Sequence, residues 1–265
     1  MSTGSAKPLI CFLSEVPMKP ADHANVFVLV PAAGSGSRMQ AGINKQLLEL
    51  QGQTVIEHTI DRLDRHPDVS GLILIAAEID LTAMEAIAKR RAWPHLYRVI
   101  TGGATRQHSV LSGLQALAAH PDCHDDSIVL VHDGARCLID PLTISRVIAG
   151  IREHGVCGAA LPVRDTIKKA SDDGYVIETP DRSRLFAMQT PQGARFAPLL
   201  AAYQAMTAAG RILTDDLAVM EAAGHPVFLT AGNERNFKLT TRLDLQMAQW
   251  ILNSGPEPSD ALIKS

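Results

Sequence analysis

A glycine-rich turn followed by two cations is the part of this sequence best suited to chemistry. The string Pro31-Ala-Ala-Gly-Ser-Gly-Ser37 consists of small residues, so backbone N–H groups can approach an anion closely. Arg38 and Lys45 follow at a spacing that lets both side chains reach the same bound phosphates. This stretch therefore predicts a nucleotide-phosphate site, whose turn residues are Pro31, Ala32, Ala33, Gly34, Ser35 and Gly36.

Two better-known glycine motifs do not fit this turn. The dinucleotide fingerprint G-x-G-x-x-G needs a third small residue, and that position holds Met39 when the motif is counted from Gly34. The P-loop string G-x-x-x-x-G-K-[ST] does not occur. The pattern A-A-G-x-G-x-R-M, followed by Lys45-Gln46, resembles the nucleotidyltransferase signature of sugar-phosphate pyrophosphorylases. Within that group it is most similar to the cytidylyltransferases that activate 2-C-methyl-D-erythritol 4-phosphate.

Further motifs extend this resemblance over residues 26–252. In chain order they are G-G-x-x-R-x-x-S at 102–109, V-H-D-G-A-R at 131–136, P-V-R-D-T-I-K at 162–168, D-R-x-x-L-F-x-x-Q-T-P-Q at 181–192, T-D-D at 214–216 and N-F-K-L-T at 236–240. Three departures from the family pattern bear on the site. Ala104 replaces an Asp, so base recognition is expected to rely on backbone atoms. Cys137 replaces a Pro, and Asn44 replaces the Pro before the lysine, which predicts a looser loop around Lys45.

The resemblance implies a role for each matching residue. The catalytic residues would be Arg38, Lys45, Arg182 and Lys238. Gly103, Ser109 and Asp133 would join the turn in binding the nucleotide. The methylerythritol phosphate would contact Arg136, Thr166, Thr190, Thr214 and Asp215. A divalent cation, Mg²⁺, would be held mainly by the CTP phosphates, with Asp133 as its protein ligand.

The implied reaction is transfer of CMP from CTP to 2-C-methyl-D-erythritol 4-phosphate with release of pyrophosphate. An alternative is a cytidylyltransferase for another polyol phosphate, such as D-ribitol 5-phosphate, although Lys168 of the D-T-x-K string favours methylerythritol. A nicotinamide-dependent oxidoreductase is disfavoured by Met39, and a non-catalytic nucleotide-binding regulator by the retained pair Arg38 and Lys45.

The elements that must position these residues alternate between strand and helix. Continuous apolar runs predict buried strands at 26–30, 71–77, 96–101, 127–131 and 157–163, and later strands are expected at 227–230 and 236–240. Helices are expected at 54–65, 81–91, 110–120, 141–153, 194–208, 215–223 and 242–252, the first opened by a Thr54/Glu57 capping box. The pattern predicts an α/β fold with a doubly wound, mostly parallel sheet, Rossmann-like in its nucleotidyltransferase variant. Four strand ends, at 31–45, 102–109, 133–136 and 164–169, should line one cleft.

Residues 164–189 interrupt this alternation. Two strand-like pieces, 166–169 and 175–178, flank a polar turn at 171–174, which predicts a projecting β-hairpin arm. Such an arm needs a partner surface, so a homodimer is expected. The resemblance places Thr166 and Arg182 of the arm in the neighbouring subunit's cleft.

Composition restricts the class of protein further. The net charge of −3 argues against a nucleic-acid partner, and no run of 18 apolar residues predicts a membrane span. The four cysteines form no C-x-x-C pair, which favours a reducing cytoplasm. The cluster of His and acidic residues at 120–126 has no second cluster that would complete a zinc site, and Ser109 lacks the hydrolase elbow G-x-S-x-G. We expect a flexible extension at 1–24, a nucleotidyltransferase domain at 25–253 and a flexible tail at 254–265.

Overall fold

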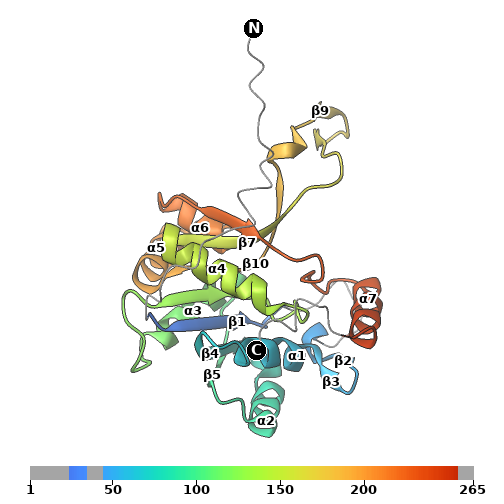
Figure 1. Ribbon diagram of the computed structural model, residues 1–265. Helices are drawn as coiled ribbons and strands as arrows, with labels where there is room; N and C mark the ends of the chain where they lie inside the picture. Colours follow the sequence, from blue (N-terminus) through green and yellow to red (C-terminus); the bar gives the residue numbers. More distant parts are fainter. Residues whose placement is uncertain (1–23, 35–43, 256–265) are drawn as a thin grey trace.

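The computed structural model describes residues 24–34 and 44–255, and a seven-stranded sheet forms its centre (Figure 1). The strand order is β11-β7-β10-β6-β1-β4-β5. The strands are β1 (Val26–Pro31), β4 (Val69–Ala76), β5 (Leu96–Thr101), β6 (Ile128–Val131), β7 (Val156–Pro162), β10 (Phe186–Arg195) and β11 (Phe228–Ala231). All neighbouring pairs are parallel except the two pairs that β10 makes. The predicted mostly parallel α/β fold is confirmed.

The central strand β1 is buried on both faces, as its continuous apolar run predicts. Phe27 and Leu29 pack in one core cluster with α3 (Arg106–Leu117), α5 (Phe196–Ala208) and α6 (Asp216–Ala222). Val28 and Val30 pack in the opposite cluster with α1 (Val55–Asp64), α2 (Leu81–Arg91) and α4 (Pro141–His154). Helices therefore cover both faces of the sheet, which is the doubly wound arrangement.

Local sequence signals set most helix boundaries. The Thr54 hydroxyl accepts from the backbone N–H of Glu57, and the Glu57 carboxylate accepts from the backbone N–H of Thr54, so the predicted capping box starts α1. The last helix, α7 (Arg242–Asn253), packs against a small two-stranded sheet of β2 (Glu49–Leu50) and β3 (Gln53–Thr54). Three single-turn 3₁₀ helices complete the described elements: η3 (Lys45–Leu47), η4 (Glu78–Asp80) and η5 (Arg182–Arg184).

Strand β10 was not predicted, and the sequence analysis was wrong to start a helix at Ala194. Residues 186–189, which were assigned to the arm, instead enter the sheet opposite β7, with Phe186 paired to Pro162. The register shifts between Met188 and Gln192, because Pro191 has no N–H to give to a ladder. Pro and Gly normally indicate a turn, and here they lie in an irregular antiparallel strand.

The predicted strand at 236–240 is also wrong, since this segment has no regular secondary structure. Side-chain and backbone hydrogen bonds hold it instead of a strand ladder. The Asn236 amide donates to the Thr190 carbonyl over 2.7 Å, and the Leu239 N–H donates to the Ala135 carbonyl over 2.9 Å. The segment is thereby fastened to the loop that follows β6.

The predicted arm forms a short hairpin that projects away from the sheet (Figure 1). Strands β8 (Lys169–Ala170) and β9 (Val176–Glu178) pair antiparallel to each other and to no other strand of the described residues. The turn closes through a hydrogen bond from Ser171 N–H to the Tyr175 carbonyl, with Gly174 at a φ of +91°. The expected terminal segments lie largely outside the described residues, and no helix in the described ranges has the length and apolarity to span a bilayer.

Candidate active site

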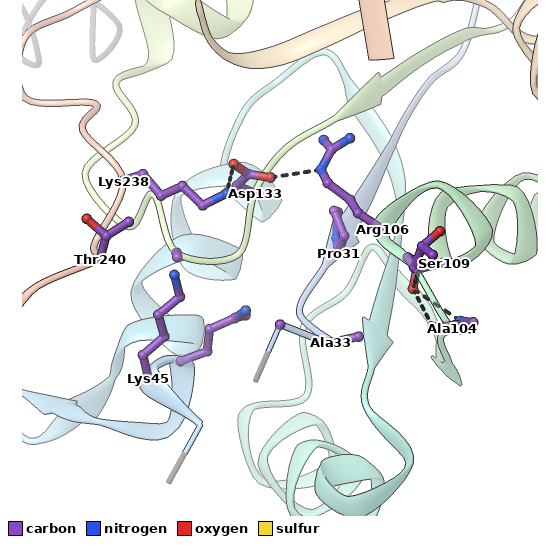
Figure 2. A pocket seen from close by; sticks show the side chains of 14 residues that line it. Pro31, Ala33, Lys45, Ala104, Arg106, Ser109, Asp133, Lys238 and Thr240 are labelled. Carbon is purple, nitrogen blue, oxygen red and sulfur yellow. Dashed lines mark hydrogen bonds and ion pairs between the residues drawn. The ribbon is translucent and has the colours of Figure 1, made fainter. Parts of the chain in front are cut away.

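A cavity of about 550 Å³ opens at the carboxyl ends of β1, β5 and β6 (Figure 2). This is the place where ligands bind in doubly wound sheets. Its described lining consists of Pro31, Ala33, Gly34, Lys45, Gln46, Gly103, Ala104, Thr105, Arg106, Ser109, Asp133, Ala135, Lys238 and Thr240. The structure thus brings together three of the four predicted strand ends with the segment at 236–240.

Eight of the predicted site residues line this cavity: Pro31, Ala33, Gly34, Lys45, Gly103, Ser109, Asp133 and Lys238. Ala32 lies between two of them and is buried, and its N–H donates to the Ile75 carbonyl of β4. Ser35, Gly36 and Arg38 lie outside the described residues.

The other predicted residues are not among the lining residues. Contrary to the expectation of four converging strand ends, residues 164–169 are not part of the described wall. Thr166 and Arg182 are exposed on the arm, where Arg182 Nη1 donates to the Arg164 carbonyl over 2.9 Å. Thr214 is exposed, and Asp215 caps α6 by accepting from the Ala218 N–H. Their substrate contacts stay predictions.

The Asn44 side chain holds the residue before Lys45 in place, while residues 35–43 of the loop that was expected to be looser lie outside the described residues. The Asn44 amide donates to the Ala32 carbonyl over 3.2 Å and to Asp80 Oδ2 over 2.8 Å. Its side-chain oxygen accepts from the Gln46 N–H and caps η3. A carboxamide with three partners therefore takes over the restraint that the family obtains from Pro. Lys45 begins η3 directly beside the turn at Pro31–Gly34.

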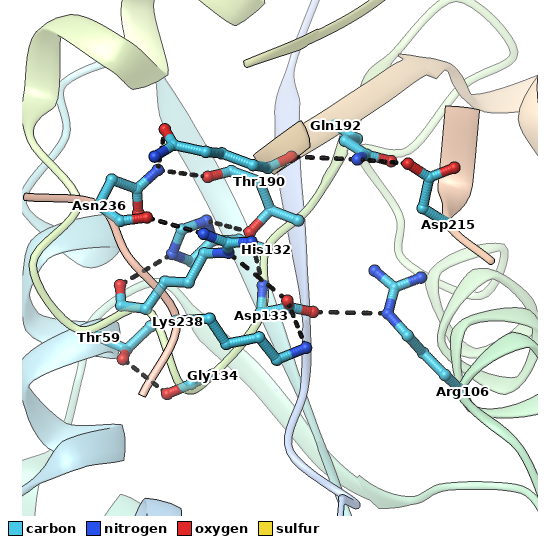
Figure 3. A network of polar contacts seen from close by, with 12 residues as sticks. Thr59, Arg106, His132, Asp133, Gly134, Thr190, Gln192, Asp215, Asn236 and Lys238 are labelled. Carbon is cyan, nitrogen blue, oxygen red and sulfur yellow. Dashed lines mark hydrogen bonds and ion pairs between the residues drawn. The ribbon is translucent and has the colours of Figure 1, made fainter. Parts of the chain in front are cut away.

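Asp133 lies at the centre of a cluster of three cations, two of which, Lys238 and Arg106, are labelled in Figures 2 and 3. Lys238 Nζ lies 2.9 Å from Oδ2, Arg106 Nε 3.4 Å from Oδ1 and Arg136 Nε 3.6 Å from Oδ2. Burial alone would raise the pKa of Asp133, but the charges of Lys238, Arg106 and Arg136 outweigh it and hold the pKa well below its usual range. The carboxylate is therefore ionised. Its single negative charge holds three positively charged side chains in place.

Arg136 lies behind Asp133, outside the cavity lining. Its side chain is 11% exposed, and Nη1 donates to the Asn236 carbonyl over 2.8 Å. Burial lowers the pKa of Arg136, and the Asp133 carboxylate offsets part of this effect. The side chain thus connects the loop after β6 to the segment that carries Lys238.

Thr190 supports the backbone of Asp133 (Figure 3). The buried Thr190 hydroxyl accepts from the Asp133 N–H over 3.0 Å and lies 3.1 Å from His132 Nδ1. His132 Nε2 lies 3.2 Å from the Arg136 carbonyl, which only accepts, so we assign the proton to Nε2 and a bare acceptor to Nδ1. Each polar group of this chain then has a partner when His132 is neutral.

Burial lowers the pKa of His132 to about 4. An unfolded His titrates near pH 6.5, so between these values the unfolded chain binds a proton that the folded chain does not. Stability is therefore complete above about pH 6.5 and falls as the pH drops towards 4, by about 3 kcal/mol in full. We expect His132 to make the free energy of unfolding in urea about 2 kcal/mol lower at pH 5 than at pH 7, and His132→Gln to remove this difference. The exposed His124→Gln serves as control, and an unchanged pH dependence in His132→Gln would contradict the assignment.

The turn after β5 is a second close-packed wall of the cavity. A side chain at Gly103 would place its Cβ 2.5 Å from the Cβ of His108, so only glycine fits. The buried Ser109 hydroxyl donates to the Thr105 carbonyl over 2.9 Å and accepts from the Gly103 N–H over 3.1 Å. Ser109 thus shapes the turn. Ala104 also lines this wall. At this position the wall therefore presents backbone groups to the cavity, where the family motif has an Asp carboxylate.

Arg106 is the main site residue that the predicted list lacks. It occupies the first position of α3 after the Thr105 N-cap, and its guanidinium pairs with Asp133 on one side and Asp216 on the other. Burial alone would lower the pKa of Arg106, but Asp216 and then Asp133 raise it above its usual value. The G-G-x-x-R motif contains this Arg, but its pairing with a residue 110 positions later is not visible in the sequence.

A metal ion would find one protein carboxylate here. The described residues contain no group of three or more His, Cys, Asp or Glu side chains placed to hold a metal ion. Among the described residues that line the cavity, Asp133 is the only carboxylate. One carboxylate combined with phosphate oxygens is a donor set that suits Mg²⁺, which retains several waters.

Known proteins of similar sequence share one name. A family model described as IspD, 2-C-methyl-D-erythritol 4-phosphate cytidylyltransferase, matches residues 26–254. The protein of that name from Desulforamulus reducens is 41% identical over 229 residues, which cover 86% of this chain and 96% of the relative. The protein of the same name from Synechocystis sp. is 39% identical over 225 residues, which cover 85% of this chain and 96% of the relative.

Solved structures give the same result. The chain resembles 4-diphosphocytidyl-2C-methyl-D-erythritol synthase from Anaerococcus prevotii with a TM-score of 0.76 and 28% identity, covering 88% of this chain and 97% of that one. The similarity to 2-C-methyl-D-erythritol 4-phosphate cytidylyltransferase from Thermus thermophilus has a TM-score of 0.67 and 29% identity, covering 86% and 99%. Both the sequence and the fold are thus shared along nearly the whole length of these relatives.

Proposed function

The chain belongs to the 2-C-methyl-D-erythritol 4-phosphate cytidylyltransferase family, and from this premise we propose how its residues perform the family's reaction. The enzyme transfers CMP from CTP to 2-C-methyl-D-erythritol 4-phosphate in isoprenoid precursor synthesis. A phosphate oxygen of the acceptor attacks the α-phosphorus of CTP, the bond from that phosphorus to the bridging oxygen breaks, and pyrophosphate leaves. We assign this chemistry to a single domain spanning residues 25–253.

One observation carries the assignment of roles: cations converge on the cavity in excess of carboxylates. Lys45, Arg106 and Lys238 line it, and Arg136 lies behind it, against the carboxylates of Asp133 and Asp216. Two polyanions must meet in this reaction, so positive charge and positioning supply most of the catalysis. An acceptor phosphate is already anionic, and the reaction therefore needs no general base.

Lys45 and Arg38 would bind the α-phosphate oxygens and the departing pyrophosphate. Ala33 and Gly34 of the turn line the cavity with Lys45, and their backbone N–H groups, together with those of Ser35 and Gly36 of the same motif, would bind the phosphates. Gly103, Ser109 and the backbone at Ala104 would face the cytosine. Arg106, at the start of α3 in the same wall, would also contact the nucleotide.

Lys238 would exchange partners when the acceptor enters. Its ammonium group now pairs with Asp133, yet its side chain is 40% exposed and can swing to an incoming phosphate. Asp133 would still be neutralised by Arg106 and Arg136, and one of its oxygens would become available to a ribose hydroxyl or a metal ion. Mg²⁺, held by Asp133 and the CTP phosphates, would supply additional positive charge to the triphosphate.

We also propose a homodimer in which the arm completes the partner's site. Tyr175, Val176 and Ile177 are 75%, 59% and 61% exposed, respectively, on a hairpin that has no core of its own. An apolar surface of this kind needs a cover. Thr166 and Arg182 would then reach the neighbouring cavity, where Arg136, Thr190, Thr214 and Asp215 of that subunit are expected to position the acceptor. The free thiols of Cys137 and Cys157 support a reducing cytoplasm as its location.

A pyrophosphate-release assay tests the proposed function. With Mg²⁺ present, we expect CTP and 2-C-methyl-D-erythritol 4-phosphate to give rapid release, and ATP, GTP or UTP to give little. Chelation by EDTA should abolish the release, and added Mg²⁺ should restore it. D-ribitol 5-phosphate serves as the acceptor control. Equal turnover with that acceptor, or turnover that survives EDTA, would contradict the assigned substrate or cation.

A further inference from the structure

A buried acid–phenol pair lies directly behind Arg106. The Tyr203 side chain on α5 is fully buried, and its hydroxyl donates to Asp216 Oδ1. Asp216, also fully buried, is the first residue of α6. Its two oxygens accept from Arg106 Nη1 over 2.9 Å and from Nη2 over 2.6 Å. A fork-to-fork pair of this kind fixes the plane of a guanidinium as well as its position.

The position of Asp216 is itself fixed from two directions. The Gln192 side-chain oxygen on β10 accepts from the backbone N–H groups of Asp216 and Leu217, over 3.0 and 3.1 Å. The Gln107 amide on α3, next to Arg106, donates to the Arg211 carbonyl and the Thr207 hydroxyl. Helices α3, α5 and α6 are therefore joined around the ion pair, and the carboxylate cannot follow Arg106 if that side chain moves.

Arg106 retains donors on the cavity side. Among its contacts with described residues, two of its five N–H groups bond to Asp216 and one to Asp133. Its side chain remains 30% exposed and lines the cavity. The Tyr203 hydroxyl and the Asp216 carboxylate do not line that cavity, so any effect they have on a bound nucleotide passes through Arg106.

We propose that Tyr203 and Asp216 are positioning residues that hold the Arg106 guanidinium in the orientation in which it contacts CTP. The proposal rests on the proposed function, because it assigns Arg106 to the nucleotide. Without the phenol, the carboxylate loses one of its donors, and the guanidinium gains freedom to turn out of the cavity wall. The cost then falls on nucleotide binding rather than on the transfer step.

A double-mutant cycle on the full-length enzyme tests this inference. Tyr203→Phe keeps the ring and removes only the donor, so we expect the KM for CTP to rise about five- to tenfold, with kcat and the KM for the acceptor changed less than about twofold. Lys cannot form the two-pronged pair, so Arg106→Lys should raise the KM for CTP as well. In the Arg106→Lys background, Tyr203→Phe should have little further effect, because the oriented guanidinium that Tyr203 supports is already absent.

Controls separate this role from a structural one. Tyr97→Phe, at a half-buried tyrosine outside the cavity lining whose hydroxyl makes a 3.5 Å contact with the Ala119 carbonyl, should leave the KM for CTP unchanged. Thermal unfolding reports the stability of each variant, and Asp216→Asn provides the same cycle should Tyr203→Phe not fold. An unchanged KM in Tyr203→Phe, or an equal rise in both backgrounds, would overturn the inference. Wild-type enzyme that releases no pyrophosphate from CTP would instead overturn the proposed function.

Discussion

Lys45→Ala is expected to lower kcat by a factor of about 10²–10³, while the affinity for CTP falls much less. The pentavalent transition state carries more charge on its equatorial oxygens than the bound nucleotide does, so the missing ammonium costs most at that point. Single-turnover kinetics measure the transfer step, and equilibrium titration with CTP measures binding. The same pattern is expected for Arg38→Ala.

Lys89→Ala is the matched control, because Lys89 is exposed near the end of α2 and does not line the cavity. Lys45→Arg retains the charge at a different shape and should recover part of the rate. A Lys45→Ala enzyme with kcat within a few-fold of wild type would remove Lys45 from the chemistry. A loss confined to CTP affinity would make Lys45 a binding residue only.

A mixture of Arg182→Ala and Lys238→Ala chains should regain activity that neither homodimer has. If each arm serves the neighbouring cavity, a mixed dimer has one site with both substitutions and one site with neither. Random pairing of equal amounts makes about half of the dimers mixed, so about a quarter of the wild-type activity should return. Co-expression of the two chains followed by the pyrophosphate assay measures it.

The control mixture pairs Lys238→Ala with Lys45→Ala. Both residues line the cavity of their own chain, so every mixed dimer has a defect in each site and activity should stay low. Recovery in the control mixture would indicate that each cavity also receives residues other than those of the arm from the neighbouring subunit. Absence of recovery in the test mixture would show that Arg182 does not act in the neighbouring subunit.

The sequence predicts those parts of the fold whose signals are local. The apolar run at β1, the Thr54 capping box and the helix over 81–91 each depend on neighbours within a few residues, and each is confirmed. Strand β10 was missed because its Pro191 and Gly193 are typical of a turn. Strand β10 lies between β6 and β7, and the hydrogen bonds to these two strands make an extended conformation favourable there.

In the site, too, the residues with local signals are predicted and the contacts between distant residues are not. Lys45, Gly103, Asp133 and Lys238 belong to motifs that can be read in the sequence, and the structure places all four on one cavity. The pairing of Arg106 with Asp216 joins residues far apart in the chain, so no local pattern indicates it. The bonds of Asn44 to Ala32 and Asp80 also join distant residues, and the sequence, where Asn stands in place of a Pro, does not indicate them.

The pairing of Phe186 with Pro162 has a consequence for how such enzymes diverge. The polypeptide leaves the sheet and re-enters it at adjacent points, so the excursion between them can lengthen, shorten or change composition while every strand keeps its alignment. Selection for which copies associate can therefore act on this detachable stretch while the nucleotide-handling half of the molecule is left untouched.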